Sequence, residues 1–190
     1  MATTTAKTAV VAVVVMASLM APGHASAEPG EVATVVLHVA DYQHVPAREL
    51  ADAQKKAARP YGNIGIRLVW TDGNAREATG GGALHVVILN AHMTEAKNQD
   101  PGTFGQASPR TKRAYIYYPR LVAHAMRTNG DPATTLALVL AHEIGHLLLP
   151  EYSHAPSGLM RAHWEGRVDN IPSFIPAQAT TIRMMLASAN

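Results

Sequence analysis

The chain of 190 residues contains no cysteine, so disulfide bonds are excluded. Without disulfides, the fold must be held by its hydrophobic core and by any metal ion that it binds. Hydrophobic residues make up 47% of the chain, which is enough for a core, and the length predicts one domain. The sequence has no internal repeat and no interdomain linker.

Positive charge is sparse and scattered. The sequence has 16 Lys and Arg against 14 Asp and Glu, so its formal net charge is only +2. The densest basic groups are Lys55-Lys56 and Arg110-Lys112-Arg113. A nucleic-acid-binding surface needs a denser basic face, so we expect no nucleic-acid partner.

The apolar run Thr8 to Met20 is too short to cross a membrane, which takes about 20 residues, and Pro22-Gly23-His24 follow it directly. Lys7 before the run and Ala25-Ser26-Ala27 after it are typical of a signal peptide and its cleavage site. We therefore predict a signal peptide at residues 1–27 and a mature domain at 28–190. The expected protein is extracellular or periplasmic, without a stable membrane anchor, and its Ala-rich composition favours a bacterial source.

The stretch His142-Glu143-Ile144-Gly145-His146 carries the chemistry. Residues four apart project from one face of a helix, so His142 and His146 can share a metal ion. Glu143 lies about a quarter-turn round the helix, where it can reach a water on that metal without being a ligand. A chance match on a polar helix is the alternative. The flanking residues are strongly apolar, however, and burial of these polar groups without partners would be costly.

His154 and the turn Ser157-Gly158-Leu159-Met160 follow the motif. Together these residues resemble the metzincin clan of zinc metalloproteases, and within it the matrixin-like secreted bacterial members, whose pattern is H-E-x-x-H-x-x-G-x-x-H followed by a Met-turn. The resemblance implies Zn²⁺ held by His142, His146 and His154, with Met160 beneath the metal.

The sequence departs from that pattern at the third ligand. His154 lies eight residues after His146, which is two more than the pattern allows, and Leu149 stands where the pattern has glycine. Pro150 can still end the helix, because it lacks an N–H group. Glu151 and His163 are therefore alternative third ligands. Matrixins often bind Ca²⁺, so a calcium ion stays open, but the sequence contains no Asp- and Asn-rich calcium loop that supports it.

The resemblance implies a secreted zinc endopeptidase that cleaves peptide bonds with a zinc-bound water, with Glu143 as the general base. Two other functions stay open. One is an exported zinc-binding or recognition domain without activity, and the other is a zinc hydrolase that acts on a cell-wall amide. The presence of Glu143 favours an enzyme, because metal binding alone needs no base at that position.

The implied fold is α+β, with a twisted mixed sheet, two helices packed on it and a C-terminal third helix. Patterning predicts strands at Glu31–Ala40, Ile64–Trp70, Leu84–Leu89 (central in the sheet) and Ala114–Tyr118, and helices at Val45–Ala58, Pro132–Leu149 and Pro176–Ala187. Pro60 and Gly62 are expected to end the first helix, Gly80–Gly82 to form a turn, and Asn90–Gly102 to form a loop. The buried face of the last helix is predicted to contain Ile182, Met185 and Leu186.

A short extended piece is predicted at Thr103-Phe104-Gly105-Gln106-Ala107. The resemblance places it where the family has an antiparallel edge strand above the metal, so these five residues would pair with the backbone of a peptide substrate. A plain surface loop is the alternative. Tyr152 lies within the ligand stretch and is expected to be a packing or surface residue, and the substrate pocket is expected to involve Leu138 and residues from His163 to Phe174.

Overall fold

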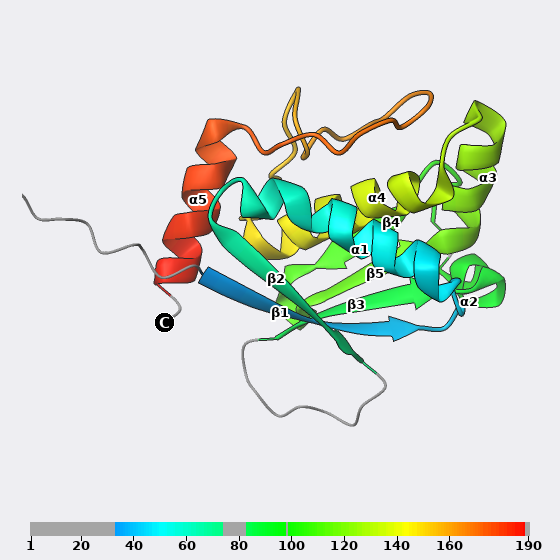
Figure 1. Ribbon diagram of the computed structural model, residues 1–190, viewed down its shortest axis with the longest axis horizontal. Coiled ribbons are helices and arrows are strands. Elements are labelled where there is room, and N and C mark those ends of the chain that lie inside the picture. Colours follow the sequence, from blue (N-terminus) through cyan, green and yellow to red (C-terminus); the bar gives the residue numbers. More distant parts are fainter. Residues whose placement is uncertain (1–32, 74–82, 98, 189–190) are drawn as a thin grey trace, which may run out of the picture. The chain divides into compact units, whose positions relative to one another are not determined.

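A computed structural model of the chain describes residues 33–73, 83–97 and 99–188 (Figure 1). The predicted signal peptide at residues 1–27 and the predicted turn at Gly80–Gly82 lie outside these ranges.

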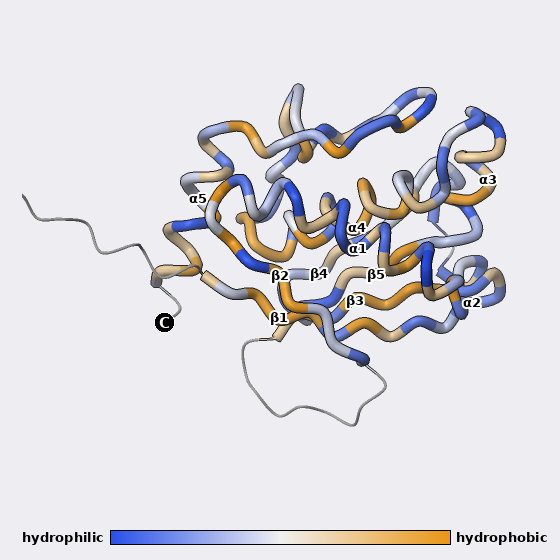
Figure 2. Tube along the Cα trace, viewed as in Figure 1, coloured by the Kyte–Doolittle hydropathy of each residue, from blue (hydrophilic) through white to orange (hydrophobic). Residues whose placement is uncertain are grey.

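Five strands form one mixed sheet in the order β2-β1-β3-β5-β4. Neighbouring strands run parallel except β4, which pairs antiparallel with β5 at one edge. The central position of β3 confirms the prediction from its nearly continuous apolar sequence, and hydrophobic residues dominate this strand in Figure 2. The strands are β1 (Ala33–Asp41), β2 (Ile66–Asp72), β3 (Leu84–Leu89), β4 (Gly105–Ser108) and β5 (Arg113–Tyr117).

One face of the sheet is covered by the helices α1 (Ala47–Gly62) and α4 (Pro132–Leu148) (Figure 1). Alternate residues of β1 (Val35, Leu37 and Val39) are buried beneath these helices, as expected for a strand with period two. In α1, Ala53 and Ala57 are fully buried. These small side chains leave room for α4 to lie close to α1.

Helix α4 begins where the sequence predicts. The side chain of Asp131 accepts a hydrogen bond from the backbone N–H of Thr134 at 3.0 Å, and Pro132 occupies the first turn. Fourteen of its 17 residues are buried. A helix that is apolar on all sides is stable only inside a protein, so α4 is the central helix of the fold.

We predicted that α1 ends at Ala58, but it continues to Gly62 and contains Pro60 in its last turn. Proline there costs one backbone hydrogen bond. The next residue, Tyr61, offsets this cost. Its side chain is fully buried, its hydroxyl donates to the carbonyl of Ala141 at 2.7 Å, and its ring packs edge-on against Phe174. Packing of Tyr61 against α4 thus outweighs the tendency of Pro60 to end helix α1.

Two helices were not predicted. α2 (Ala91–Ala96) replaces part of the expected loop, with the Asn90 side chain as its N-cap. α3 (Tyr118–Thr128) begins directly after β5, so Tyr118 is helical and not a sheet residue as predicted. No turn residues separate this strand from this helix, but Pro119 in the first turn of α3 and Asn129 at its end are local signals that could have revealed it.

The last helix, α5 (Pro176–Ala187), has the predicted bounds. Its buried side chains are Gln178, Ala179 and Ile182, with Leu186 partly buried. Met185 is 46% exposed, so its predicted burial is wrong. The helix docks on the rest of the fold mainly through its first half.

The structure confirms an α+β fold with a five-stranded mixed sheet and helices packed on it. A short 3-10 turn, η1 (Pro109–Thr111), connects β4 to β5. In the described ranges, no helix has both the length and the apolar character that a membrane span requires.

Candidate metal centre and cleft

Two histidines of the motif project from one face of α4. His142 and His146 lie one helical turn apart, and their Nε2 atoms are 3.0 Å from each other. The spacing in the sequence is sufficient to explain this pair, because any regular helix brings residues i and i+4 together.

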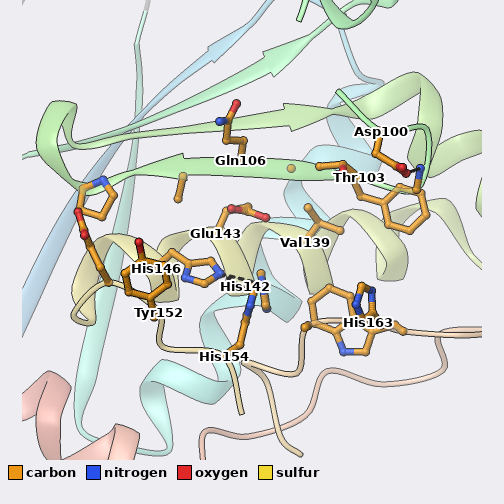
Figure 3. Close-up of a pocket in the computed structure, with 18 of the residues that line it drawn as sticks. Asp100, Thr103, Gln106, Val139, His142, Glu143, His146, Tyr152, His154 and His163 are labelled. Atoms are coloured by element: carbon orange, nitrogen blue, oxygen red, sulfur yellow. Dashed lines mark hydrogen bonds between the residues drawn. The ribbon is translucent and has the colours of Figure 1, made fainter. Parts of the chain in front are cut away.

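The third histidine reaches the same point from outside the helix. The backbone becomes extended at Leu149, and the chain then turns back so that His154 Nε2 lies 3.0 Å from His146 Nε2 and 3.3 Å from His142 Nε2. Figure 3 shows these three side chains gathered at one place beneath Glu143. In the part of the chain that the structure describes, they are the only group of three or more His, Cys, Asp or Glu side chains placed to hold a metal ion.

The predicted alternatives to His154 lie elsewhere. Glu151 and His163 line the cleft in which the histidine cluster lies, but they do not belong to the cluster. Tyr152 is 96% exposed, in agreement with its expected role as a surface residue. The structure therefore brings together His142, His146 and His154 and leaves the other two candidates out.

The donor set fits a tetrahedral metal. Nitrogen ligands about 2.0–2.1 Å from a tetrahedral zinc ion are about 3.3–3.4 Å from one another, close to the 3.0–3.3 Å separations between these Nε2 atoms. A proton on one ring would satisfy only one of the three contacts, whereas a cation at the centre satisfies all three. The same arrangement fits any metal ion that accepts three imidazole ligands.

Burial keeps the first two rings neutral. Burial, with a smaller contribution from the neighbouring imidazoles, lowers the pKa of His142 to about 3 and the pKa of His146 to about 4. Neutral imidazole is the form that binds a metal. At neutral pH the ligands on α4 therefore need not lose a proton before a metal binds.

The outer nitrogens of these rings have partners of their own. His142 Nδ1 donates to the carbonyl oxygen of Leu159 at 2.9 Å, which leaves the lone pair on Nε2, facing the cluster. His146 Nδ1 lies 3.2 Å from the hydroxyl of Ser153. Partners of this kind fix the orientation and tautomer of metal-binding histidines.

Met160 lies under the motif helix. Its side chain is fully buried, and a Cβ atom built on Gly145 would lie only 2.5 Å from its sulfur. Because Gly145 has no side chain, the turn that contains Leu159 and Met160 can pack directly against α4. The predicted turn thus supports His142 through a carbonyl group and the helix backbone through a thioether.

Glu143 is buried beside the cluster. Its side chain is 6% exposed, and desolvation raises the pKa of its carboxyl group to about 8. A Cβ atom built on Gly105 would lie 2.7 Å from Glu143 Oε1. The carboxyl group is therefore covered by the first residue of β4. A carboxyl group with such a pKa is suited to accept and return a proton near neutral pH.

A cleft of about 1010 Å³ contains the histidine cluster and Glu143. All five residues of the predicted extended piece line it, although β4 itself starts only at Gly105 and runs to Ser108. β4 is an antiparallel edge strand, as the resemblance implies, so it pairs with β5 on one side only. The five residues are Thr103, Phe104, Gly105, Gln106 and Ala107.

The opposite wall contains Trp164, whose ring packs edge-on against His142 with centroids 4.6 Å apart. Leu138, expected to shape the pocket, is instead buried in the core, and its neighbour Val139 faces the cleft. One residue further along a helix the side chain is turned by about 100°, which is enough for Val139 to face the cleft while Leu138 does not.

The cleft is acidic. Asp100, Glu151 and Glu165 line it together with Glu143, and no lysine or arginine is among the lining residues. The chain as a whole carries a small positive formal charge, so the acidic character is local to this cleft.

Sequence reasoning missed the part that α3 plays at the cleft. Arg120 donates to the carbonyl oxygens of Gln99, Asp100 and Thr103 at 2.7–3.1 Å and so holds the rim that leads into β4. His124, on the next turn, contacts the carbonyl oxygen of Gly166 at 2.9 Å, near the opposite wall. Pro119 and Asn129 mark the ends of α3 in the sequence, but no local signal places Arg120 and His124 at the cleft, because that depends on how α3 packs.

No protein-family model matches this chain, and no curated protein matches it in sequence.

Proposed function

We propose that this chain is a secreted zinc-dependent endopeptidase of the metzincin type. One observation carries the proposal: three histidine Nε2 atoms meet at metal-ligand spacing in the cleft that also contains a buried glutamate with a raised pKa. The H-E-x-x-H pattern followed by a Met-turn supports the same assignment. The predicted signal peptide supports export.

His142, His146 and His154 would hold zinc through Nε2. Zinc, when bound, supplies a Lewis acid that polarises a carbonyl group and makes water more acidic. A nearby divalent cation also favours the ionised form of Glu143, because an opposite charge lowers the pKa of a carboxyl group.

Glu143 would act as the general base and then as the general acid. As a carboxylate it takes a proton from the attacking water, and it then gives this proton to the amine that leaves when the peptide bond breaks. Burial under Gly105 excludes water from one side of the carboxyl group and restricts its orientation.

The free edge of β4 would bind the substrate. An edge strand has N–H and C=O groups that can pair with an extended peptide, and such pairing reads little of the side-chain sequence. β4 lies over Glu143 through Gly105, so a peptide on its outer edge would run along the cleft that contains the histidines.

The experiment that tests this proposal is an incubation of the purified zinc-loaded protein with a diverse peptide library, with new termini identified by mass spectrometry. Glu143→Gln is run in parallel as the matched control. New termini in the wild type alone would support the peptidase. Zinc bound at one ion per chain without any cleavage would contradict it and leave a zinc-binding domain or a hydrolase of cell-wall amides.

A further inference from the structure

The third ligand needs support that α4 does not provide. His154 is exposed and lies in an irregular segment, beyond the point where the helix ends. An exposed side chain on such a segment loses much conformational freedom when it binds a metal, which lowers metal affinity. Some other contact must therefore hold this segment close to the ligands of α4.

The residue next to His154 makes that contact. The backbone carbonyl of Ser153 accepts a hydrogen bond from Nε2 of Gln178 at 2.8 Å, and the Ser153 hydroxyl lies 3.2 Å from Nδ1 of His146. Ser153 thus touches the second ligand with its side chain and fixes the third ligand through its backbone.

Gln178 is well placed to act as an anchor. It lies in the first turn of α5 and is 8% exposed, while its neighbours on the same face, Ala179 and Ile182, are in the hydrophobic core. Its Oε1 atom is buried without a hydrogen-bond partner among the described residues.

We propose that Ser153 and Gln178 are positioning residues of the metal centre, through which the C-terminal helix holds His146 and His154 in place for the metal. This inference rests on the metal binding in the proposed function but not on peptidase activity. The stretch from His146 to His154 is longer than the metzincin pattern, and Ser153 lies within it. The longer connection would be tolerated because Gln178 ties its far end to α5.

Partners of metal-binding histidines typically contribute 10- to 100-fold to metal affinity. We therefore expect Ser153→Ala and Gln178→Ala each to weaken zinc binding by about 10-fold or more. Ser153→Thr keeps the hydroxyl and should retain most of the affinity. Thr180→Ala removes an exposed hydroxyl from the same helix and should leave the affinity unchanged.

The test is zinc affinity of the full chain, measured without substrate by competition with a chromophoric chelator. Thermal unfolding of each variant in excess EDTA is measured beside it, because a purely structural role would lower stability without zinc and leave the affinity of the folded protein unchanged. Gln178→Leu keeps the size of the side chain and removes the unsatisfied oxygen, so it serves if Gln178→Ala does not fold.

A second comparison separates the two positions. In a His154→Ala background, Gln178→Ala should have a smaller further effect on zinc affinity than in the wild type, since one of the two ligands that it helps to place is already gone. Ser153→Ala should still weaken binding there, through His146. Unchanged zinc affinity in folded Ser153→Ala and Gln178 variants would overturn this inference alone, whereas a wild-type protein that binds no zinc would overturn the proposed function as well.

Discussion

Gly105 covers Glu143: a Cβ atom on this glycine would lie 2.7 Å from both Cγ and Oε1 of the glutamate. Real side chains do not approach so closely, so the edge strand and the carboxyl group can be this close only because residue 105 has no side chain. The contact joins the strand proposed to bind the substrate to the proposed general base.

Gly105→Ala should therefore reduce peptidase activity without loss of zinc. The added methyl group must displace either β4 or the carboxyl group, and a misplacement of about 1 Å in a catalytic group can cost about 100-fold in rate. The measurements are kcat/KM on a peptide from the library and zinc content. Gly62→Ala is the matched control, because a Cβ atom there meets nothing within 4 Å. Full activity of the Gly105 variant would show that the position of Glu143 is not critical.

Glu143→Gln should lower turnover while it stabilises the metal-free protein. General acid–base catalysis contributes about 100- to 10,000-fold, which is the expected loss in kcat. In the metal-free protein the folded-state pKa of about 8 lies above the ordinary 4.5, so the folded state binds more protons and loses stability as the pH rises through this range.

The stabilisation by Gln should accordingly grow between pH 4.5 and pH 8, as read from urea unfolding in EDTA. A difference between variant and wild type that is independent of pH would contradict the burial of an ionisable carboxyl group. Glu95→Gln, the same change at an exposed position outside the cleft, is the matched control and should not alter the pH dependence in this way.

In the metal-free protein the two buried histidines should lower the stability as the pH falls below about 6.5, against the opposite and smaller effect of the single Glu143 carboxyl group. In the unfolded chain a histidine has a pKa near 6.5, whereas burial lowers the pKa of His142 to about 3 and that of His146 to about 4. At a pH below 6.5 and above the folded-state pKa values, the two histidines bind more protons in the unfolded state than in the folded state. Their contribution to the free energy of unfolding therefore decreases as the pH falls. Urea unfolding at pH 7, 6 and 5 in EDTA measures the slope. His146→Gln should make it shallower, and an unchanged slope would contradict the depressed pKa of His146.

Peptides with lysine or arginine near the cleaved bond should be preferred over acidic peptides. The cleft is lined by Asp100, Glu151 and Glu165 without a lysine or arginine, so it attracts positive charge. The comparison is kcat/KM for a matched pair of peptides, one basic and one acidic, at low and high salt. Salt should reduce the preference, because it screens exposed charges. Equal rates at low salt would show that these carboxylates do not set specificity.

The sequence predicted most of the regular structure because its signals are local. The start of α4 is specified by Asp131 and Pro132, and the strands are marked by apolar runs and alternation. The prediction was wrong where tertiary packing overrides a local signal and where one element follows another directly. Pro60 lies within α1 because Tyr61 packs against α4, and α3 was missed because it follows β5 without a turn.

The sequence by itself determined His142, Glu143 and His146, because helical periodicity fixes how residues one to four positions apart project. Only the tertiary structure decided the rest of the centre. His154 joins the cluster while Glu151 and His163 do not, since the path of an irregular segment is set by distant contacts, here from Gln178 to Ser153 and from His142 to Leu159. In the same way, no local pattern could place Gly105 over Glu143, because a strand and a helix far apart in the chain meet only when the sheet and α4 pack together.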